Sequence, residues 1–129
     1  MIIDKQLDDT AAVREVMQQY IDGAGGRPEL LRPAFHADAM MFGNMGSKRW
    51  DVPITRFIER VAKADTPPPG PNYRAELTSI VITGDIAVVQ LLEQDYFGMD
   101  FANWFTLARF EDRWRIVAKA YTSPGPRSA

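Results

Sequence analysis

Tyr20 is the first side chain of this sequence that could act on a ligand. It lies among apolar residues that recur at steps of three and four positions, so a helix would bury its ring on one stripe. A buried phenol needs a hydrogen-bond partner, and it can donate to an oxygen atom of a ligand. Two interpretations stay open: a core residue whose hydroxyl is satisfied within the protein, or a donor in a binding site.

His36 and Asp38 are the residues that could move protons. His36 is the only histidine of the chain, and Asp38 follows it by two positions. A neighbouring carboxylate can fix the tautomer of a histidine that acts as a general base. The same two residues can instead cap a short helix and its exit turn, and we favour this structural interpretation. If the protein is an enzyme, the predicted catalytic residues are Tyr20, His36 and Asp38.

Small side chains predict a hollow on one face of a sheet. Thr106 and Ala108 share one face of a strand, and Ala118 and Ala120 share one face of the next. They either leave room for a ligand or let a helix pack closely, and the aromatic neighbours favour a pocket. Gln90 is expected on the same inner face, where its amide has to pair with a ligand, with Thr106 or with a helix end. The predicted ligand-binding residues are Phe42, Trp50, Phe57, Gln90, Trp104 and Thr106.

Composition argues against several classes of function. The absence of cysteine excludes disulfides, thiolate nucleophiles and cysteine zinc sites, and it leads us to expect a cytoplasmic location. The 15 basic and 17 acidic residues are scattered, with a net charge of -2, which argues against a nucleic-acid partner. No apolar run approaches membrane-spanning length, so we expect no membrane partner. A single histidine and no carboxylate cluster predict no metal, and no motif indicates another cofactor.

Apolar periodicity divides the chain into a helical first part and a strand-rich second part. Helices are predicted from Asp9 or Thr10 to the glycines at 23–26, from Pro28 to Phe35, and from Asp51 or Pro53 to before Thr66. Strands are predicted over 39–43, up to position 50, and over 74–83, 86–95, 101–110 and 114–122, in a sheet that is antiparallel throughout. The tight turn Gly84-Asp85 joins two of them, and a proline-rich connector at 66–71 separates the two parts.

These elements predict one α+β domain over residues 1–129, with N-terminal helices packed on a curved antiparallel sheet that forms a cone-like barrel around an internal pocket. We expect a short lead at 1–8 and a loose tail at 123–129.

The strand that begins at Ile86 is largely apolar on both faces. Because helices can cover only one face, the other face is expected to meet a second surface, and we predict a homodimer packed through the sheets. The alternative is a sheet wrapped by its own tail and loops. Strand parity places Asp95, Asn103 and Lys119 on the outer face, and a bulge would reverse this placement.

The order of these elements resembles the nuclear transport factor two-like, or SnoaL-like, superfamily, over nearly the whole chain. The segment Thr83-Gly84-Asp85-Ile86-Ala87-Val88-Val89 is similar to its putative lumazine-binding-like branch. Further similar segments are Tyr20-Ile21-Asp22-Gly23, Ala34-Phe35-His36-Ala37-Asp38-Ala39, Trp104-Phe105-Thr106-Leu107 and Arg113-Trp114-Arg115-Ile116-Val117. The resemblance specifies the fold and leaves the activity open, because members of the superfamily include isomerases, polyketide cyclases, dehydratases, epoxide hydrolases and pure binding proteins.

The ketosteroid isomerases of that superfamily give a residue-by-residue test. They use a tyrosine of the first helix, which Tyr20 matches, together with a carboxylate base and a protonated carboxylic acid. The base position falls at Phe42 or Gly43 and the acid position near Thr106, and none of these side chains can take that role. The resemblance therefore argues against this particular reaction.

The sequence leads to two hypotheses. In the first, the protein holds a small, largely apolar, cyclic or polyketide-like molecule in a pocket and acts on it as an isomerase, cyclase or dehydratase by acid-base chemistry. In the second, it is a non-catalytic ligand-binding module or a dimeric interaction module.

Overall fold

The computed structural model of the chain describes residues 2–64 and 69–126, and it confirms the predicted α+β fold. The helices are α1 (Ile2–Ala24), the short 3-10 helix η1 (Pro28–Leu30), α2 (Leu31–Ala34) and α3 (Ile54–Ala62). The strands are β1 (Phe35–Met45), β2 (Lys48–Arg49), β3 (Val52–Pro53), β4 (Pro69–Thr83), β5 (Ile86–Tyr96), β6 (Met99–Phe110) and β7 (Arg113–Ser123). No helix of the described residues is long and apolar enough to cross a membrane.

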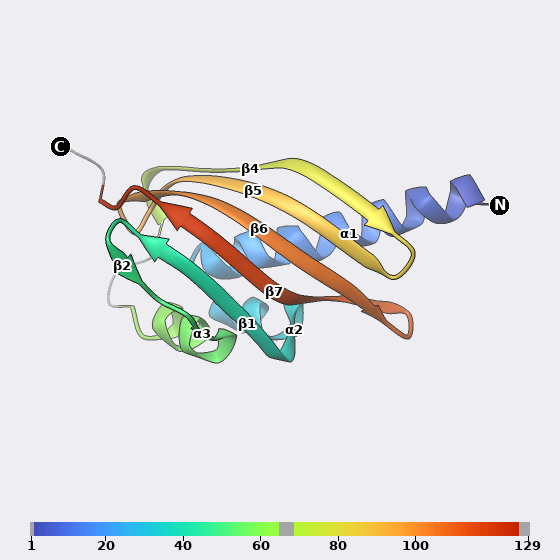
Figure 1. Cartoon of the computed structure of the whole chain (residues 1–129), viewed down its shortest axis with the longest axis horizontal. Helices are drawn as coiled ribbons and strands as arrows, with labels where there is room; N and C mark the ends of the chain where they lie inside the picture. Colours follow the sequence, from blue (N-terminus) through green and yellow to red (C-terminus); the bar gives the residue numbers. More distant parts are fainter. Residues whose placement is uncertain (1, 65–68, 127–129) are drawn as a thin grey trace.

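The strands form one curved, open sheet in the order β2-β1-β7-β6-β5-β4, and β3 pairs with β1. Helices α1 and α2 pass behind this sheet in the view of Figure 1, so its two faces have different surroundings. Thr83 pairs with Ile86, which confirms the predicted turn Gly84-Asp85. The prediction of a wholly antiparallel sheet is wrong at one place, because β1 and β7 are parallel. Sequence periodicity finds strands but does not tell which strand distant in the chain lies beside β1.

Helix α1 begins earlier than its predicted N-cap. It starts at Ile2, so the segment expected to be a short lead belongs to the helix. Asp9 lies within the helix and does not cap it, and its carboxylate accepts a hydrogen bond from Arg109 at 2.8 Å. The residues before Asp9 have side chains that suit a helix, and Asp9 itself suits an N-cap. The local sequence therefore allows the helix to begin at either place.

The ends of the strand-rich part also extend further than predicted. Pro69 to Pro71 of the expected connector lie in β4, where Pro69 is an edge residue opposite Tyr96, whereas residues 65–68 lie outside the described part of the chain. Ser123 of the expected tail is buried at the end of β7, and Pro126 bridges Met99. Residues 127–129 of that tail lie outside the described part of the chain.

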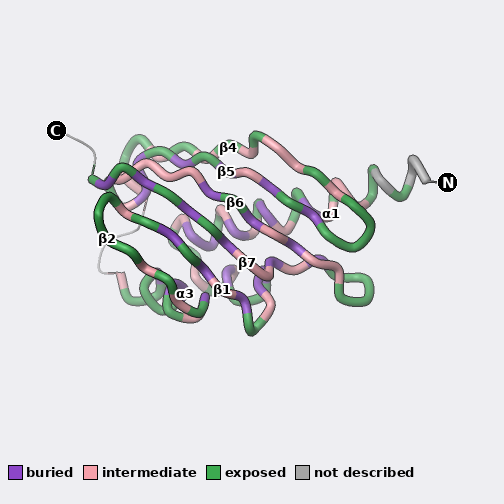
Figure 2. Tube along the Cα trace, viewed as in Figure 1, coloured by how far each residue is buried: buried purple, intermediate pink, exposed green. Residues whose placement is uncertain are grey.

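The faces of β5 are the reverse of the predicted ones. Val89, Leu91 and Glu93 are buried against the helices, whereas Val88 and Leu92 are exposed on the other face, as the alternating burial in Figure 2 shows. The predicted inward orientation of Gln90, Trp104 and Thr106 is therefore wrong. Both faces of β5 are apolar enough to form a core, so hydropathy alone could not choose between them.

A bulge in β7 decides where Lys119 lies. Thr106 pairs with Ala118 and the next residue, Leu107, pairs with Ile116, so β7 has one residue more than β6 at this point. The extra residue reverses the parity of β7 beyond Val117. Lys119 and Tyr121 therefore face the helices, whereas Ala118 and Ala120 face outward, and the prediction of a hollow beside these alanines is wrong.

Asp95 and Asn103 are buried as well, with 8% and 0% of their surface exposed, so their predicted outer-face position is also wrong. The inner face thus carries polar groups inside an otherwise apolar core.

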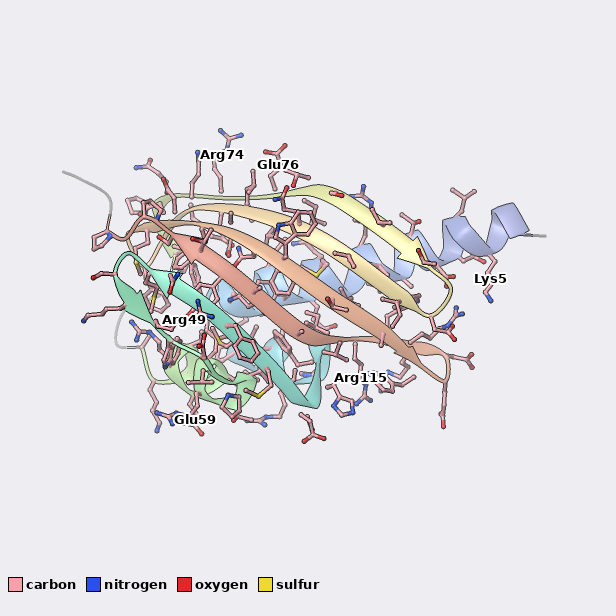
Figure 3. The ribbon with its side chains drawn as sticks, viewed as in Figure 1. Lys5, Arg49, Glu59, Arg74, Glu76 and Arg115 are labelled. Atoms are coloured by element: carbon pink, nitrogen blue, oxygen red, sulfur yellow. The ribbon has the colours of Figure 1, made fainter. Side chains whose placement is uncertain are left out.

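At the edge strand β4, the charged side chains of Arg74 and Glu76 project away from the sheet (Figure 3), as charged residues commonly do on unpaired edges.

Candidate functional site

Lys119 is the centre of the candidate site. Its ammonium nitrogen Nζ donates a hydrogen bond of 2.9 Å to the hydroxyl oxygen of Tyr20, and only 5% of the residue is exposed. Nζ also lies 4.2 Å from the ring centroid of Phe57, and the rings of Tyr20, Tyr121 and Phe105 lie 5.3, 5.4 and 6.0 Å away. Four aromatic rings thus surround one amine. The ring of Phe57 is near enough to attract the cation, whereas Tyr20 meets it through its hydroxyl group.

Three separate parts of the chain build this environment. The buried stripe of α1 contributes Tyr20, and the buried face of α3 contributes Phe57, whose ring stacks on Tyr20 with 6.3 Å between the centroids. The bulged strand β7 contributes Lys119 and Tyr121. Gly43 of β1 lies against the ring of Tyr121, where any side chain would collide with the ring.

Glu93 of β5 is the second buried charged group of the site. Its Oε2 atom accepts a hydrogen bond of 2.8 Å from the hydroxyl of Tyr73, and its Oε1 atom accepts one of 2.9 Å from the amide of Asn103. The same amide group of Asn103 also donates to the carbonyl oxygen of Leu91 at 3.1 Å. These donors hold the carboxyl group in place although only 2% of Glu93 is exposed.

Lys119 and Glu93 influence each other without direct contact. Among the described residues, no ion pair or hydrogen bond joins the two side chains. Burial lowers the pKa of Lys119 to about 8, and the negative charge of Glu93 opposes this shift. Burial raises the pKa of Glu93, and Lys119, Tyr73 and Asn103 oppose that shift. An amine and a carboxyl group with altered proton affinity therefore lie within electrostatic reach of each other on the inner face.

Both side chains line one hollow, here called the Lys119 hollow. Its walls are Met41, Met45, Trp50, Phe57, Arg60, Glu93, Tyr96, Phe97, Met99, Phe101, Lys119 and Tyr121. It encloses about 390 Å³ including the solvent at its mouth, but the centre of a water molecule can move through only about 30 Å³, enough for one or two waters. A larger ligand has to displace side chains, and the three methionines of the wall can adapt their shape most readily.

Arg60 lies at the mouth of the Lys119 hollow. Its guanidinium carbon is 5.7 Å from the ring centroid of Trp50 and 5.3 Å from that of Phe97, so the cation lies against two aromatic rings. Arg60 is exposed, and no ion pair holds it in the described part of the chain. A guanidinium in this position can pair with an anionic or carbonyl group of a ligand at the mouth.

The structure brings some of the predicted site residues together. Tyr20 is fully buried and holds Lys119, while Trp50 and Phe57 line the Lys119 hollow. Phe42 and Trp104 are exposed on the outer face, with 44% and 45% of their surface accessible.

The two polar residues of the predicted binding set also lie away from the Lys119 hollow. The side chain of Gln90 accepts a hydrogen bond of 2.7 Å from Thr78, which satisfies its amide oxygen without a ligand. Thr106 pairs with Val88 and Ala118 on the outer face. A ligand role for these residues would therefore require a site on that face.

His36 and Asp38 lie apart from Tyr20. His36 accepts a hydrogen bond of 3.1 Å at Nδ1 from the backbone N–H of Asp38, and its ring lies 4.9 Å from that of Phe110. The structural interpretation has the pair cap a short helix and its exit turn, whereas this contact joins the two residues to each other at the start of β1. His36 borders a separate surface hollow with Arg32 and Arg115, and it is absent from the walls of the Lys119 hollow. The catalytic roles of His36 and Asp38 stay predictions.

Sequence reasoning missed Lys119, Glu93, Asn103 and Tyr73. One signal was available: Glu93, Asn103 and Lys119 are polar residues inside three consecutive apolar strands, and antiparallel pairing can bring such residues together on one face. No group of three or more possible metal-binding side chains occurs among the described residues. The arrangement offers a buried amine, a buried carboxyl group and aromatic walls, which suit a small organic ligand.

The comparisons agree with this fold. Residues 8–122 match the family described as "Putative lumazine-binding", and the chain belongs to this family. No protein with a curated description matches the sequence.

Two solved structures illustrate the likeness. A protein of unknown function from Shewanella baltica, described as NTF2-like, is 27% identical with a TM-score of 0.81, over 91% of this chain and 94% of the other. An NTF2-like protein of unknown function from Methylobacillus flagellatus is also 27% identical with a TM-score of 0.81, over 90% of this chain and 92% of the other. The chain therefore has the NTF2-like fold, which confirms the predicted resemblance.

Proposed function

We propose that the protein binds a small, largely apolar and cyclic molecule in the Lys119 hollow, with an oxygen atom of the ligand directed at Lys119 and Glu93. The observation that carries this proposal is the pair of buried, opposite charges that border the same aromatic hollow without contacting each other. Burying an amine and a carboxyl group costs free energy, and a ligand between them would recover part of that cost through hydrogen bonds. The family description names lumazine, a planar heteroaromatic dione, and this chemistry suits aromatic walls with two polar groups at the base.

The finer form of the proposal is acid-base catalysis on that ligand, as in an isomerase, cyclase or dehydratase. The Lys119 ammonium group can stabilise negative charge that develops on a ligand oxygen, and the Glu93 carboxyl group can accept or return a proton. Tyr20 then positions Lys119 through their hydrogen bond. His36 and Asp38 have no part in this arrangement, because they do not border the Lys119 hollow.

Non-catalytic ligand binding is the second candidate function. It is favoured by the hydrogen bonds that already engage both oxygen atoms of Glu93, because these bonds compete with proton transfer to the carboxyl group but leave its charge able to orient a ligand. Binding without any turnover of the bound compounds would support this candidate over the enzyme.

Ligand-induced thermal stabilisation tests the binding function. Lumazine and single-ring aromatic carbonyl compounds are added to the purified protein, and the midpoint of thermal unfolding is measured as a function of ligand concentration. Trp50→Ala removes a wall of the Lys119 hollow and is expected to abolish the shift. The matched control Trp104→Ala removes a tryptophan of the outer face and should retain it. Equal shifts in both variants would contradict binding in this hollow.

We also propose that two copies pair through their outer sheet faces, as expected from the apolar strands. Support comes from the exposed side chains of Phe42 on β1, Val88 and Leu92 on β5, and Trp104 on β6. Trp104 pairs with the small Ala120, which would let a second sheet approach closely. A cytoplasmic location stays a prediction from the absence of cysteine.

The molar mass in solution tests this pairing. Light scattering should give the mass of a dimer for the natural chain and of a monomer for Trp104→Glu. Leu7→Glu is the matched control, because Leu7 is an equally apolar, exposed residue on α1. A monomeric natural chain would contradict the proposal.

A further inference from the structure

Lys119 differs from every other lysine of the chain. Lysine occurs at positions 5, 48, 63 and 119, and the first three are exposed. Lys5, for example, projects from the free end of α1 into solvent (Figure 3). Only Lys119 has its amine inside the protein, at the wall of a hollow and without a carboxylate partner in direct contact among the described residues.

We propose that Lys119 is a nucleophile that forms a reversible imine with an aldehyde or ketone bound in the Lys119 hollow. This inference rests on the function proposed above, because the carbonyl compound has to enter the same hollow. It goes further in naming a covalent bond and the chemical class of the ligand.

The position of the amine favours this reaction. Nζ is held at 2.9 Å from the hydroxyl of Tyr20, which fixes the direction of a long, flexible side chain. The face of the Phe57 ring lies 4.2 Å from Nζ and excludes water on that side. A carbonyl carbon that enters from the mouth therefore meets an amine that is already oriented.

The amine must also be neutral in part, since only its lone pair can attack. The groups that face it are the phenols of Tyr20 on α1 and Tyr121 on β7, the Glu93 carboxyl group on β5 and its partner Tyr73 on β4, with Arg60 at the mouth on α3. Burial in this environment lowers the pKa of Lys119 to about 8. A measurable fraction of the amine is therefore neutral near pH 7.

The reaction balances without an oxidant or a reductant. The lone pair of Lys119 attacks the carbonyl carbon, a C–N bond forms, and the C=O π electrons move to the oxygen, which takes a proton while the nitrogen loses one. A second proton converts the hydroxyl group into water, which leaves as the nitrogen lone pair completes the C=N bond. The resulting iminium nitrogen then releases its remaining proton, which replaces the one consumed. Amine and carbonyl compound thus give imine and water, and the buried carboxyl group of Glu93, which borders the same hollow, can carry these protons.

The walls restrict the ligand to small compounds with one planar ring. Phe57, Phe101, Tyr96 and Tyr121 offer ring faces and edges, and the space now open is smaller than a benzene ring. Benzaldehyde is therefore a suitable probe, because it needs only a modest displacement of the methionine side chains.

Reductive trapping tests the imine. The full-length protein is incubated with benzaldehyde and sodium cyanoborohydride near neutral pH, so that any imine is reduced to a stable benzyl amine, and peptide mapping by mass spectrometry measures the label at each lysine. A lowered pKa enlarges the neutral, reactive fraction of the Lys119 amine, whereas burial slows the access of benzaldehyde to it. We expect the first effect to be larger, so that Lys119 reacts about tenfold faster than Lys5, Lys48 or Lys63. Label at Lys119 no faster than at the exposed lysines would overturn the proposal.

Two variants and one competitor sharpen the result. Lys119→Met removes the amine at similar size and should lose the fast label, whereas the matched control Lys63→Met removes an exposed amine and should keep it. Benzyl alcohol has the same ring without the carbonyl group, so it should slow labelling at Lys119 and leave the exposed lysines unchanged. A fast label that benzyl alcohol does not slow would place the reaction outside the Lys119 hollow and would also overturn the proposal.

The thermal shift with benzyl alcohol or lumazine separates this inference from the function on which it rests, since neither compound forms an imine with a lysine. A shift that depends on Trp50, together with no fast label at Lys119, would refute the imine and leave ligand binding in place. The absence of a thermal shift together with the absence of a fast label at Lys119 would refute both the binding function and the imine.

Discussion

The two faces of one sheet each carry side chains that depart from the usual pattern of apolar residues inside and polar residues outside. On the inner face, Glu93, Asn103 and Lys119 are buried with at most 5% of their surface exposed. On the outer face, Val88 and Trp104 of the same strands expose 37% and 45%. A sheet that only had to be stable would exchange these positions, because buried charges cost free energy and exposed apolar groups gain nothing.

The difference indicates that each face has a separate role. On the inner face, Lys119 is held by Tyr20, and Glu93 by Tyr73 and Asn103, whereas the amide oxygen Oδ1 of Asn103 is buried without a hydrogen-bond partner among the described residues. Buried polar groups are tolerated where they are paired, which ties the positions of Lys119 and Glu93 to these partners and, through Tyr20, to the helix α1. Among the described residues, the outer face shows no buried network of this kind, and its exposed apolar side chains suit the pairing of two copies proposed above.

Glu93→Leu is expected to give the largest effect on stability. It leaves the Lys119 cation buried without a counter-charge and removes the acceptor of two hydrogen bonds, so the free energy of unfolding should fall by about 4 kcal/mol. Gln90→Leu, three residues earlier on the outer face, is the matched control and should change stability by no more than about 0.5 kcal/mol. Urea unfolding at a fixed protein concentration measures both, and similar losses would show that the two faces do not differ.

The pH dependence of stability tests the charge of Lys119 directly. The pKa of this amine is lowered from 10.5 to about 8 in the folded protein, so its contribution to stability is complete above pH 10.5 and is lost as the pH falls to about 8. A shift of this size corresponds to about 3 kcal/mol between the two pH values.

The measurement is the difference between the natural chain and Lys119→Met over that pH range. The natural chain should gain stability relative to the variant as the pH rises from about 8 to 10.5. Tyr73 and Tyr96, whose pKa values are raised by burial, destabilise the folded state above pH 10 in both proteins, so the difference isolates Lys119. A constant difference would mean that the amine is not buried as a charged group.

The sequence predicted the fold more completely than the site, for a physical reason. Helix periodicity and turn residues act locally, and they correctly placed Tyr20, Phe57 and the turn Gly84-Asp85. The inner face depended on two facts that no local pattern contains: which apolar face of β5 meets the helices, and the extra residue of β7 before Lys119. The bulge in β7 reverses which side chains face the helices in the second half of that strand, and Lys119, the central residue of the site, lies in that half.

Two adjacent valines of β5 give the smallest predicted effect and the most direct comparison of the faces. Val89 is fully buried, whereas Val88 exposes 37% of its surface on the outer face. Threonine has nearly the same shape as valine, so Val89→Thr adds a hydroxyl group to the core with little change in volume and should lower the free energy of unfolding by about 2 kcal/mol. Val88→Thr should change it by no more than about 0.5 kcal/mol at a low protein concentration, because its hydroxyl group remains in contact with water.

At higher concentrations only Val88→Thr should weaken pairing between copies, so its effect on stability should grow with concentration while that of Val89→Thr stays constant. The opposite assignment of concentration dependence would mean that the face turned toward the helices, and not the exposed one, lies between the copies.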